Sequence, residues 1–249
     1  MPSVPLIVAH RGASYDAPEN TLAAFRLGFQ QGADAIEGDF RLTKDGHVVC
    51  AHDARTKRVG DRDLEVEKST LAQLQKIDIG TWKSPTFAKE RVATLADVLA
   101  VVPRGKRAFL ELKTGPQIVP AVKQIIEAGP VPLAKLSIIS FNADTVLACR
   151  EAMPKITANW LAYYKKDDCG RRTPTPAMIL ETLKRCRAHG LGTEAKPAAI
   201  TPALIKGLKD AGLGLHVWTV DTPRLAQAFI DRGVQSITTN RPAWLRERL

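Results

Sequence analysis

Short apolar runs alternate along the chain with longer segments whose apolar residues recur every three or four positions. The first run, PLIVAH (5–10), is typical of a buried strand, and ENTLAAFRLGFQQG (19–32) follows with helical spacing and a terminal glycine. Residues 34–42 (DAIEGDFRL) predict a second strand. The turn TKDG (43–46) leads into HVVCAH (47–52), which predicts a hairpin.

The strand–helix alternation resumes in the second half of the chain. Further strands are predicted at 107–113, 136–141, 155–162, 191–196, 213–220 and 235–240. Helices are predicted at 94–103, 116–129, 142–153, 176–190 and 201–212, with one more after each of the last two strands. Leaving out the hairpin strand, eight strands remain, the number that closes a parallel barrel. An open doubly wound sheet is the alternative, but no GxGxxG fingerprint follows the first strand. We therefore predict an α/β fold, a TIM (β/α)8 barrel.

Residues 53 to about 93 interrupt this rhythm. The segment is polar, has one predicted short helix beginning near Ser69, and shows no clear second core. We interpret it as a small insertion after the second strand region. The whole chain, residues 1–249, is accordingly predicted to be one barrel domain.

The composition is that of a soluble globular protein. Hydrophobic residues make up 45% and charged residues 25% of the 249 residues. No apolar run approaches the roughly 20 residues needed to cross a bilayer, so no stable membrane insertion is expected. The opening stretch MPSVPLIV lacks the basic region of a signal peptide, and the four cysteines have no zinc-type spacing. These features predict a cytoplasmic protein, and they leave its oligomeric state open.

The net charge of +10 favours contact with phosphates of any kind, whether in nucleic acid, anionic lipid or small substrates. The basic surplus is dispersed, however, with only local clusters such as YYKKDDCGRR (163–172) and KRCR (184–187). Such clusters are typical of solvated helix faces and loops. Because no zinc-finger, RNP or basic-zipper pattern accompanies them, we expect no nucleic-acid partner.

Charged residues stand where the first two predicted strands end. In a closed α/β barrel, reactive groups lie at the C-terminal ends of the strands. His10 ends the first strand and Arg11 follows it. On the second strand Glu37 and Asp39 are two residues apart, which puts both carboxylates on one face.

Glu111 and Lys113 repeat this spacing in FLELK on the third barrel strand. The flanking residues, such as Ile36 and Leu110, are apolar, so both faces of these strands are expected to be enclosed. Buried carboxylates are unfavourable by several kcal/mol unless a cation or basic partners compensate them. Three inward carboxylates predict a site for one hard cation, Mg²⁺ or Ca²⁺. Charge-compensating structural ion pairs are the alternative interpretation.

A second imidazole, His52, lies at the end of the hairpin. Two histidines beside a cation site can act as general base and general acid around one reacting centre. Arg11 and Lys113 can hold a phosphate, the arginine through its planar fork and the lysine as a point charge. The set suits nucleophilic attack at phosphorus.

Three aromatic residues near strand ends are candidate walls of the barrel mouth, with core packing as the alternative: Phe141, Trp160 and Trp218. The remaining histidines are interpreted as structural: His47, His189 and His216.

The motifs AHRG…PENTLAAF, GADAIEGDFRLTKDGHVVCAHD and FLELK resemble, in order and spacing, signature segments of the glycerophosphodiester phosphodiesterase family. HVWTVD and ITTNRP resemble its closing segments, so the resemblance spans nearly the whole chain. It implies a TIM barrel with a small insertion. It also implies hydrolysis of glycerophosphodiesters to sn-glycerol 3-phosphate and an alcohol, with a divalent cation.

Carried over by position, the resemblance assigns roles to seven residues. Those that bind the metal are Glu37, Asp39 and Glu111; the acid–base pair is His10 and His52; the phosphate contacts are Arg11 and Lys113. It further implies that the substrate's glycerol hydroxyl attacks first, giving a cyclic phosphate that water then opens. Related phospholipases suggest His10 as the first base and His52 as the acid, an order that this sequence does not fix.

The chain departs from the family pattern at two places. Asn240 stands where the family commonly has aspartate in TDRP, and the insertion keeps Arg58 without the threonines expected after it. Both departures bear on substrate details. A lipid-directed phosphodiesterase resembling lysophospholipase D is one alternative, although no amphipathic anchor is present. A catalytically silent barrel that binds phosphorylated ligands or nucleic acid is another, against which the complete set of carboxylates and histidines argues.

Overall fold

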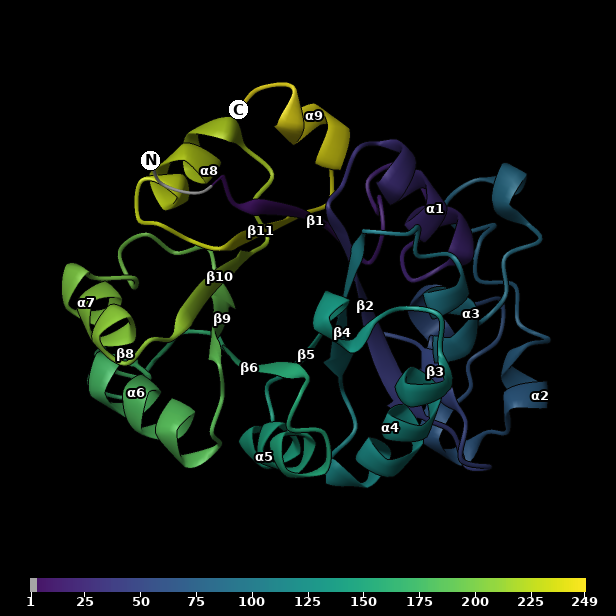
Figure 1. Ribbon diagram of the computed structural model, residues 1–249. Helices are drawn as coiled ribbons and strands as arrows, with labels where there is room; N and C mark the ends of the chain where they lie inside the picture. The colour runs from purple at the N-terminus through teal and green to yellow at the C-terminus, as the bar shows by residue number, and fades with distance from the viewer. Residues whose placement is uncertain (1–3) are drawn as a thin grey trace.

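Eight parallel strands close into a barrel in a computed structural model that describes residues 4–249. Figure 1 shows the helices arranged around this ring. The prediction of a TIM barrel is confirmed. Around the barrel the strands are β1 (Leu6–His10), β2 (Ala35–Leu42), β4 (Arg107–Leu112), β5 (Leu136–Ser140), β6 (Thr157–Ala162), β9 (Gly190–Glu194), β10 (Gly214–Trp218) and β11 (Ser236–Thr239). β11 pairs with β1 and thereby closes the ring.

Three short strands lie outside the ring: β3 (Val48–Cys50), β7 (Lys165–Lys166) and β8 (Arg172–Thr173). β3 runs antiparallel to β2 as the second arm of the predicted hairpin, while β7 and β8 pair with each other in the loop after β6. No helix within residues 4–249 is both long enough and apolar enough for a membrane span.

Most of the helices begin after a threonine or asparagine whose side chain caps the first turn. They are α1 (Leu22–Gln30), α2 (Leu71–Leu74), α3 (Leu95–Ala100), α4 (Val119–Ala128), α5 (Ala143–Ala152), α6 (Pro176–Arg185), α7 (Pro202–Asp210), α8 (Pro223–Ile230) and α9 (Pro242–Arg246). α1 starts three residues later than the sequence predicts, because the Thr21 hydroxyl accepts a hydrogen bond from the backbone N–H of Ala24 and caps the helix. Glu19 and Asn20 are thereby left in the β1–α1 loop.

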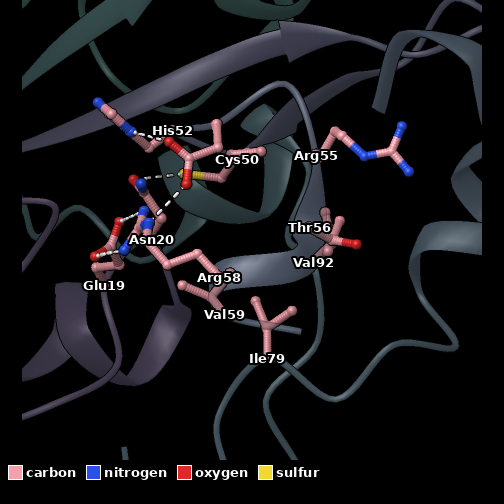
Figure 2. A pocket seen from close by; sticks show the side chains of 12 residues that line it. Glu19, Asn20, Cys50, His52, Arg55, Thr56, Arg58, Val59, Ile79 and Val92 are labelled. Atoms are coloured by element: carbon pink, nitrogen blue, oxygen red, sulfur yellow. Dashed lines mark hydrogen bonds and ion pairs between the residues drawn. The ribbon is translucent and has the colours of Figure 1, made fainter. Parts of the chain in front are cut away.

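The insertion is built from short turns and has a small core of its own. α2 begins at Leu71, close to the predicted start, after a capping box formed by Thr70. The prediction of no second core is wrong. Buried side chains of the segment cluster around Val49 of β3: Val66, Leu74, Ile77, Ile79 and Val92. Periodicity in the sequence does not predict this core, because its members are single apolar residues at irregular spacing that turns bring together. Figure 2 shows Val59, Ile79 and Val92 close to one another.

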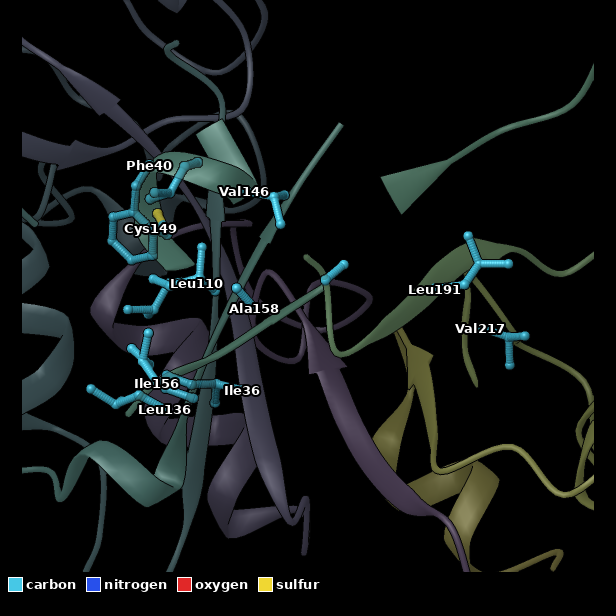
Figure 3. Close-up of a cluster of buried hydrophobic side chains, with 14 of the residues drawn as sticks. Ile36, Phe40, Leu110, Leu136, Val146, Cys149, Ile156, Ala158, Leu191 and Val217 are labelled. Atoms are coloured by element: carbon cyan, nitrogen blue, oxygen red, sulfur yellow. The ribbon is translucent and has the colours of Figure 1, made fainter. Parts of the chain in front are cut away.

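The main core lies between the barrel and the helices. Figure 3 shows Ile36, Leu110 and Leu136, whose side chains project outward from the barrel and cluster together. The alternate residues point inward, where Ala35 and Phe109 belong to a separate cluster inside the barrel. Side chains alternate along a strand, so the next residues on the inward face are Glu37 and Asp39 after Ala35, and Glu111 after Phe109. These three side chains are directed to the barrel mouth.

Candidate active site

Three carboxylates meet inside the barrel mouth. Glu37 and Asp39 come from β2, and Glu111 comes from β4 with its Cα in register with that of Asp39. One oxygen from each carboxylate lies within 4.8 Å of the others. All three side chains are buried. The enclosure expected from the apolar flanking residues therefore exists, and Glu37 and Glu111 face the cavity at the barrel mouth.

The three carboxyl groups differ in how readily they ionise, because burial and neighbouring charges shift their pKa values in different directions. Burial, together with the charges of Asp39 and Glu111, raises the pKa of Glu37 well above its usual value. Burial and the Asp39 charge raise the pKa of Glu111 to about 7. Burial also opposes ionisation of Asp39, but Arg11 and Lys113 outweigh it and lower the pKa of that carboxyl.

The donor set fits one hard divalent cation. Carboxylate oxygens are the ligands that Mg²⁺ and Ca²⁺ prefer. Glu37 Oε1 is buried and has no hydrogen-bond partner within residues 4–249, so it is an acceptor left free among negative charges. A buried orphan oxygen of this kind is unfavourable unless an ion or a donor meets it.

The two cationic side chains lie against the carboxylates. Arg11 Nε is 3.2 Å from Asp39 Oδ2, and the Arg11 backbone N–H donates to Glu37 Oε2 at 2.9 Å. Lys113 Nζ is 2.6 Å from Glu111 Oε1 and 3.4 Å from Asp39 Oδ1. The charge-compensating pairs considered from the sequence are thus present, and they leave Glu37 Oε1 unmatched.

His10 ends β1 and lies beside this group. Its Nδ1 is 2.7 Å from Asn240 Oδ1, at the end of β11. Burial, and secondarily the Arg11 charge, lowers the pKa of His10, which favours the neutral ring. Since Nδ1 is occupied by Asn240, Nε2 is the nitrogen available to a bound molecule.

His52 stands on the other side, held by residues of the insertion (Figure 2). Its Nδ1 is 2.7 Å from Asp53 Oδ1, and the other oxygen of Asp53 accepts from Arg58 Nε at 2.6 Å. Arg58 also donates through both terminal nitrogens to Glu19, at 2.7 Å each. Burial lowers the pKa of His52 even though the Asp39 charge opposes it.

A cavity of about 160 Å³ connects these groups. Its lining residues are His10, Arg11, Glu37, His52, Glu111, Lys113, Ile139, Phe141, Leu161, Trp218, Thr219 and Thr238. Phe141 and Trp218 form one wall, with ring centroids 5.6 Å apart in an edge-to-face contact. Trp160 lies outside this lining, because the alternation along β6 turns Leu161 inward and Trp160 outward. The Trp160 indole N–H donates to the Phe141 carbonyl at 3.0 Å.

Several residues that support the site were not singled out from the sequence. Asn20 donates to Asp39 Oδ2 at 2.9 Å and accepts from the Asp39 backbone N–H at 3.1 Å. Asp221 contacts Asn240, and Glu19 contacts both Arg11 and Arg58. Glu19 and Asn20 stand within the PENT motif, which carried a family signal but no assigned role.

A closed barrel with acidic, basic and imidazole groups at the C-terminal ends of its strands defines an enzyme of the TIM-barrel class. A family model described as the glycerophosphoryl diester phosphodiesterase family matches residues 10–244. The chain belongs to this family, and it is a hydrolase that acts on phosphoric diesters. The resemblance read from the motifs is confirmed.

Individual relatives agree in length and fold. The chain is 32% identical over 246 residues to the glycerophosphodiester phosphodiesterase of Caldanaerobacter subterraneus subsp. tengcongensis, covering 96% of each chain. A phosphodiesterase of Oleispira antarctica, solved in complex with the product sn-glycerol-3-phosphate, is 26% identical with a TM-score of 0.86, over 98% of this chain and 96% of that one. The fold is shared with a glycerophosphodiester phosphodiesterase from Agrobacterium tumefaciens, at 23% identity and a TM-score of 0.79, over 98% of this chain and 100% of that one.

Proposed function

We propose that this protein hydrolyses small glycerophosphodiesters to sn-glycerol 3-phosphate and an alcohol. The observation that carries the proposal is the cluster of three carboxylates beside one cavity. Two of them, Glu37 and Glu111, line that cavity together with two imidazoles and two cationic side chains. The product in the Oleispira antarctica phosphodiesterase supports the substrate class.

The cation ligands in this proposal are Glu37, Asp39 and Glu111, with Mg²⁺ or Ca²⁺ as the ion. When bound, the ion supplies charge neutralisation at the phosphoryl oxygens. Arg11 and Lys113 bind the phosphate from the same rim, Arg11 through its fork and Lys113 as a point charge.

His10 and His52 are the proposed acid–base pair. The glycerol hydroxyl next to the phosphodiester attacks phosphorus, and its proton passes to Nε2 of His10. His52 enters this step as the imidazolium and donates its proton to the oxygen of the departing alcohol as the P–O bond breaks, leaving a cyclic phosphate. Water then opens the ring, with the two histidines exchanging roles, and both return to their starting protonation.

The test is a panel of glycerophosphocholine, glycerophosphoethanolamine and lysophosphatidylcholine, each assayed for released product with Mg²⁺, with Ca²⁺ or with a chelator. We expect turnover of the deacylated substrates, dependent on a divalent cation, and a loss of about 10²–10⁴-fold in His10→Ala and in His52→Ala. Full activity in either variant contradicts the two-histidine assignment. Preference for the lysophospholipid instead supports the lipid-directed alternative.

A further inference from the structure

Asn240 joins His10 to a half-buried carboxylate, that of Asp221, in the loop after β10. Its Oδ1 is 2.7 Å from His10 Nδ1 and accepts a second hydrogen bond from Ser14 Oγ at 2.8 Å. Its Nδ2 donates to Asp221 Oδ2 at 2.6 Å. Both polar atoms of the amide side chain are therefore in use, and the amide separates the imidazole from Asp221.

Asp221 is itself fixed in place. Its Oδ1 accepts from the Thr239 hydroxyl and from the backbone N–H of Asn240, each at 2.8 Å. An ionised carboxylate has no hydrogen to donate, so the group that faces it must be the NH₂ of Asn240. The orientation of the amide follows, with its oxygen directed at His10.

We propose that Asn240 and Asp221 are positioning residues that hold His10 in the tautomer with its hydrogen on Nδ1. An amide oxygen can only accept, so Nδ1 must donate, and the protonation of one ring nitrogen determines the other. The neutral ring then presents a lone pair at Nε2, the nitrogen left for the cavity. The arrangement keeps the negative charge of Asp221 one side chain away from the ring.

The catalytic consequence of this arrangement rests on the proposed function, whereas the tautomer itself does not. The first measurement therefore needs no substrate and no metal. In ¹⁵N-histidine-labelled protein at a pH where His10 is neutral, we expect its Nδ1 shift to be that of a protonated nitrogen and its Nε2 shift that of an unprotonated one. A His10→Gln spectrum identifies the His10 signals among the five histidines.

Asn240→Leu removes the acceptor at similar volume. We expect the Nδ1–H preference to be lost, and kcat to fall about a hundredfold while KM changes less than about threefold, since a base in the wrong tautomer binds substrate but cannot take its proton. Gln227→Leu is the matched control, because Gln227 on α8 donates to Asp231 in a similar amide–carboxylate pair on the protein surface. It should change neither readout.

An exchange of the two side chains tests the network without removing it. Asn240→Asp alone sets two carboxylates against each other, and Asp221→Asn alone frees the amide to rotate, so each should lower kcat by about tenfold or more. The double variant D221N/N240D restores a donor facing an acceptor, and the carboxylate introduced at position 240 still accepts from His10. We expect it to recover kcat to within about threefold of the native protein and to keep the Nδ1–H tautomer.

The outcomes separate cleanly. An unchanged His10 tautomer in folded Asn240→Leu overturns the inference, and so does a double variant that is no better than either single one. If Asn240→Leu does not fold, the double variant and Asp221→Asn decide by the same two readouts. Absence of turnover in the native protein, with the tautomer as expected, counts against the proposed function alone.

Discussion

Asn20 is a buried residue in a left-handed backbone conformation, with φ of 59°, which asparagine adopts more readily than most residues other than glycine. The conformation places its amide against Asp39, with one hydrogen bond donated and one accepted. The Cys50 thiol also donates to Asn20 Oδ1, at 3.1 Å. The turn thus orients a side chain that holds one carboxylate of the proposed cation site in place.

Asn20→Ala should lower the affinity for the activating divalent cation by about 10–100-fold, since residues that orient a ligand contribute that much to metal affinity. Calorimetric titration of the purified protein with Mg²⁺ or Ca²⁺ measures the change. Asn142→Ala is the control. It removes the helix cap of α5, which weakens stability by about 1 kcal/mol, and should leave the affinity unchanged. Equal affinity in Asn20→Ala and the native protein would remove Asn20 from any role at the site.

His216 makes the fold sensitive to acid. Enclosure in the barrel lowers its pKa to about 4, and its Nδ1 lies 2.8 Å from Ser236 Oγ. The unfolded chain takes up the same proton near pH 6.5. Between these values the unfolded state binds more protons, so the stabilising contribution is full above pH 6.5 and is lost as the pH falls to 4.

The loss amounts to roughly 3 kcal/mol at most, from about 1.4 kcal/mol for each unit of pKa. His216→Gln keeps a polar side chain beside Ser236 and removes the titration. Urea denaturation at pH 7.5 and pH 4.5 measures the unfolding free energy of both proteins. Between the two pH values the native protein should lose more stability than the variant does. Parallel curves at the two pH values would contradict the assignment.

The residues at the barrel mouth differ in how far the sequence predicts them. Glu37, Asp39 and Glu111 could be placed together because strand alternation and apolar neighbours leave them one direction to point. Asn240 was noticed as a departure, but its contact with His10 joins positions 230 residues apart, and its orientation depends on Asp221. The oxygen and nitrogen of an amide side chain have nearly the same shape. The orientation of Asn240 is therefore known only once its hydrogen-bond partners are known.

The insertion is anchored by its own small core, and one arginine, Arg58, connects it to the site. Val66, Leu74 and Ile77 anchor it on β3, and Arg58 ties it to the β1–α1 loop through Glu19 and to His52 through Asp53. The guanidinium fork makes three charge-assisted hydrogen bonds to two carboxylates. The insertion therefore orients one imidazole of the site.

Arg58→Lys keeps the charge but loses the fork, so it should lower kcat/KM by about tenfold through misorientation of His52. Proteolytic cleavage within residues 53–93 should also become faster. Arg55→Lys is the matched control in the same segment. Its side chain contacts Asp63 and points away from His52 in Figure 2, and kcat/KM should stay within about twofold of the native value. Equal kinetics for both variants would mean that the insertion does not position His52.

At the scale of the whole molecule, the alternation of strands and helices was sufficient to predict the barrel, because eight such units have few ways to bury both faces of a parallel sheet. The same reading missed the core of the insertion, where turns rather than periodic segments gather the apolar residues. It also predicted Trp160 as a candidate wall of the barrel mouth. Which face of β6 points inward depends on the register of the strand, and a shift of one residue exchanges the two faces.

The carboxylate group couples cation binding to the stability of the entire barrel. Without a cation, the raised pKa values of Glu37 and Glu111 mean that their ionised forms are disfavoured in the folded state. Glu111→Gln should therefore raise the melting temperature of the metal-free protein at pH 8, where this carboxyl is mostly ionised. The native protein should gain about 2.7 kcal/mol from a cation at a hundred times its Kd, which is roughly 5–10 °C for a chain of this size.

The two effects together distinguish a cation site from a set of structural ion pairs. If Lys113 and Arg11 alone compensate the carboxylates, Glu111→Gln breaks a favourable contact, lowers the melting temperature and leaves any response to cations unchanged. If the carboxylates await an ion, the variant is more stable than the native protein in chelator and loses most of the cation-induced rise. Glu181→Gln on the exposed side of α6 removes one charge far from the barrel mouth, so scanning calorimetry should show the native response for it.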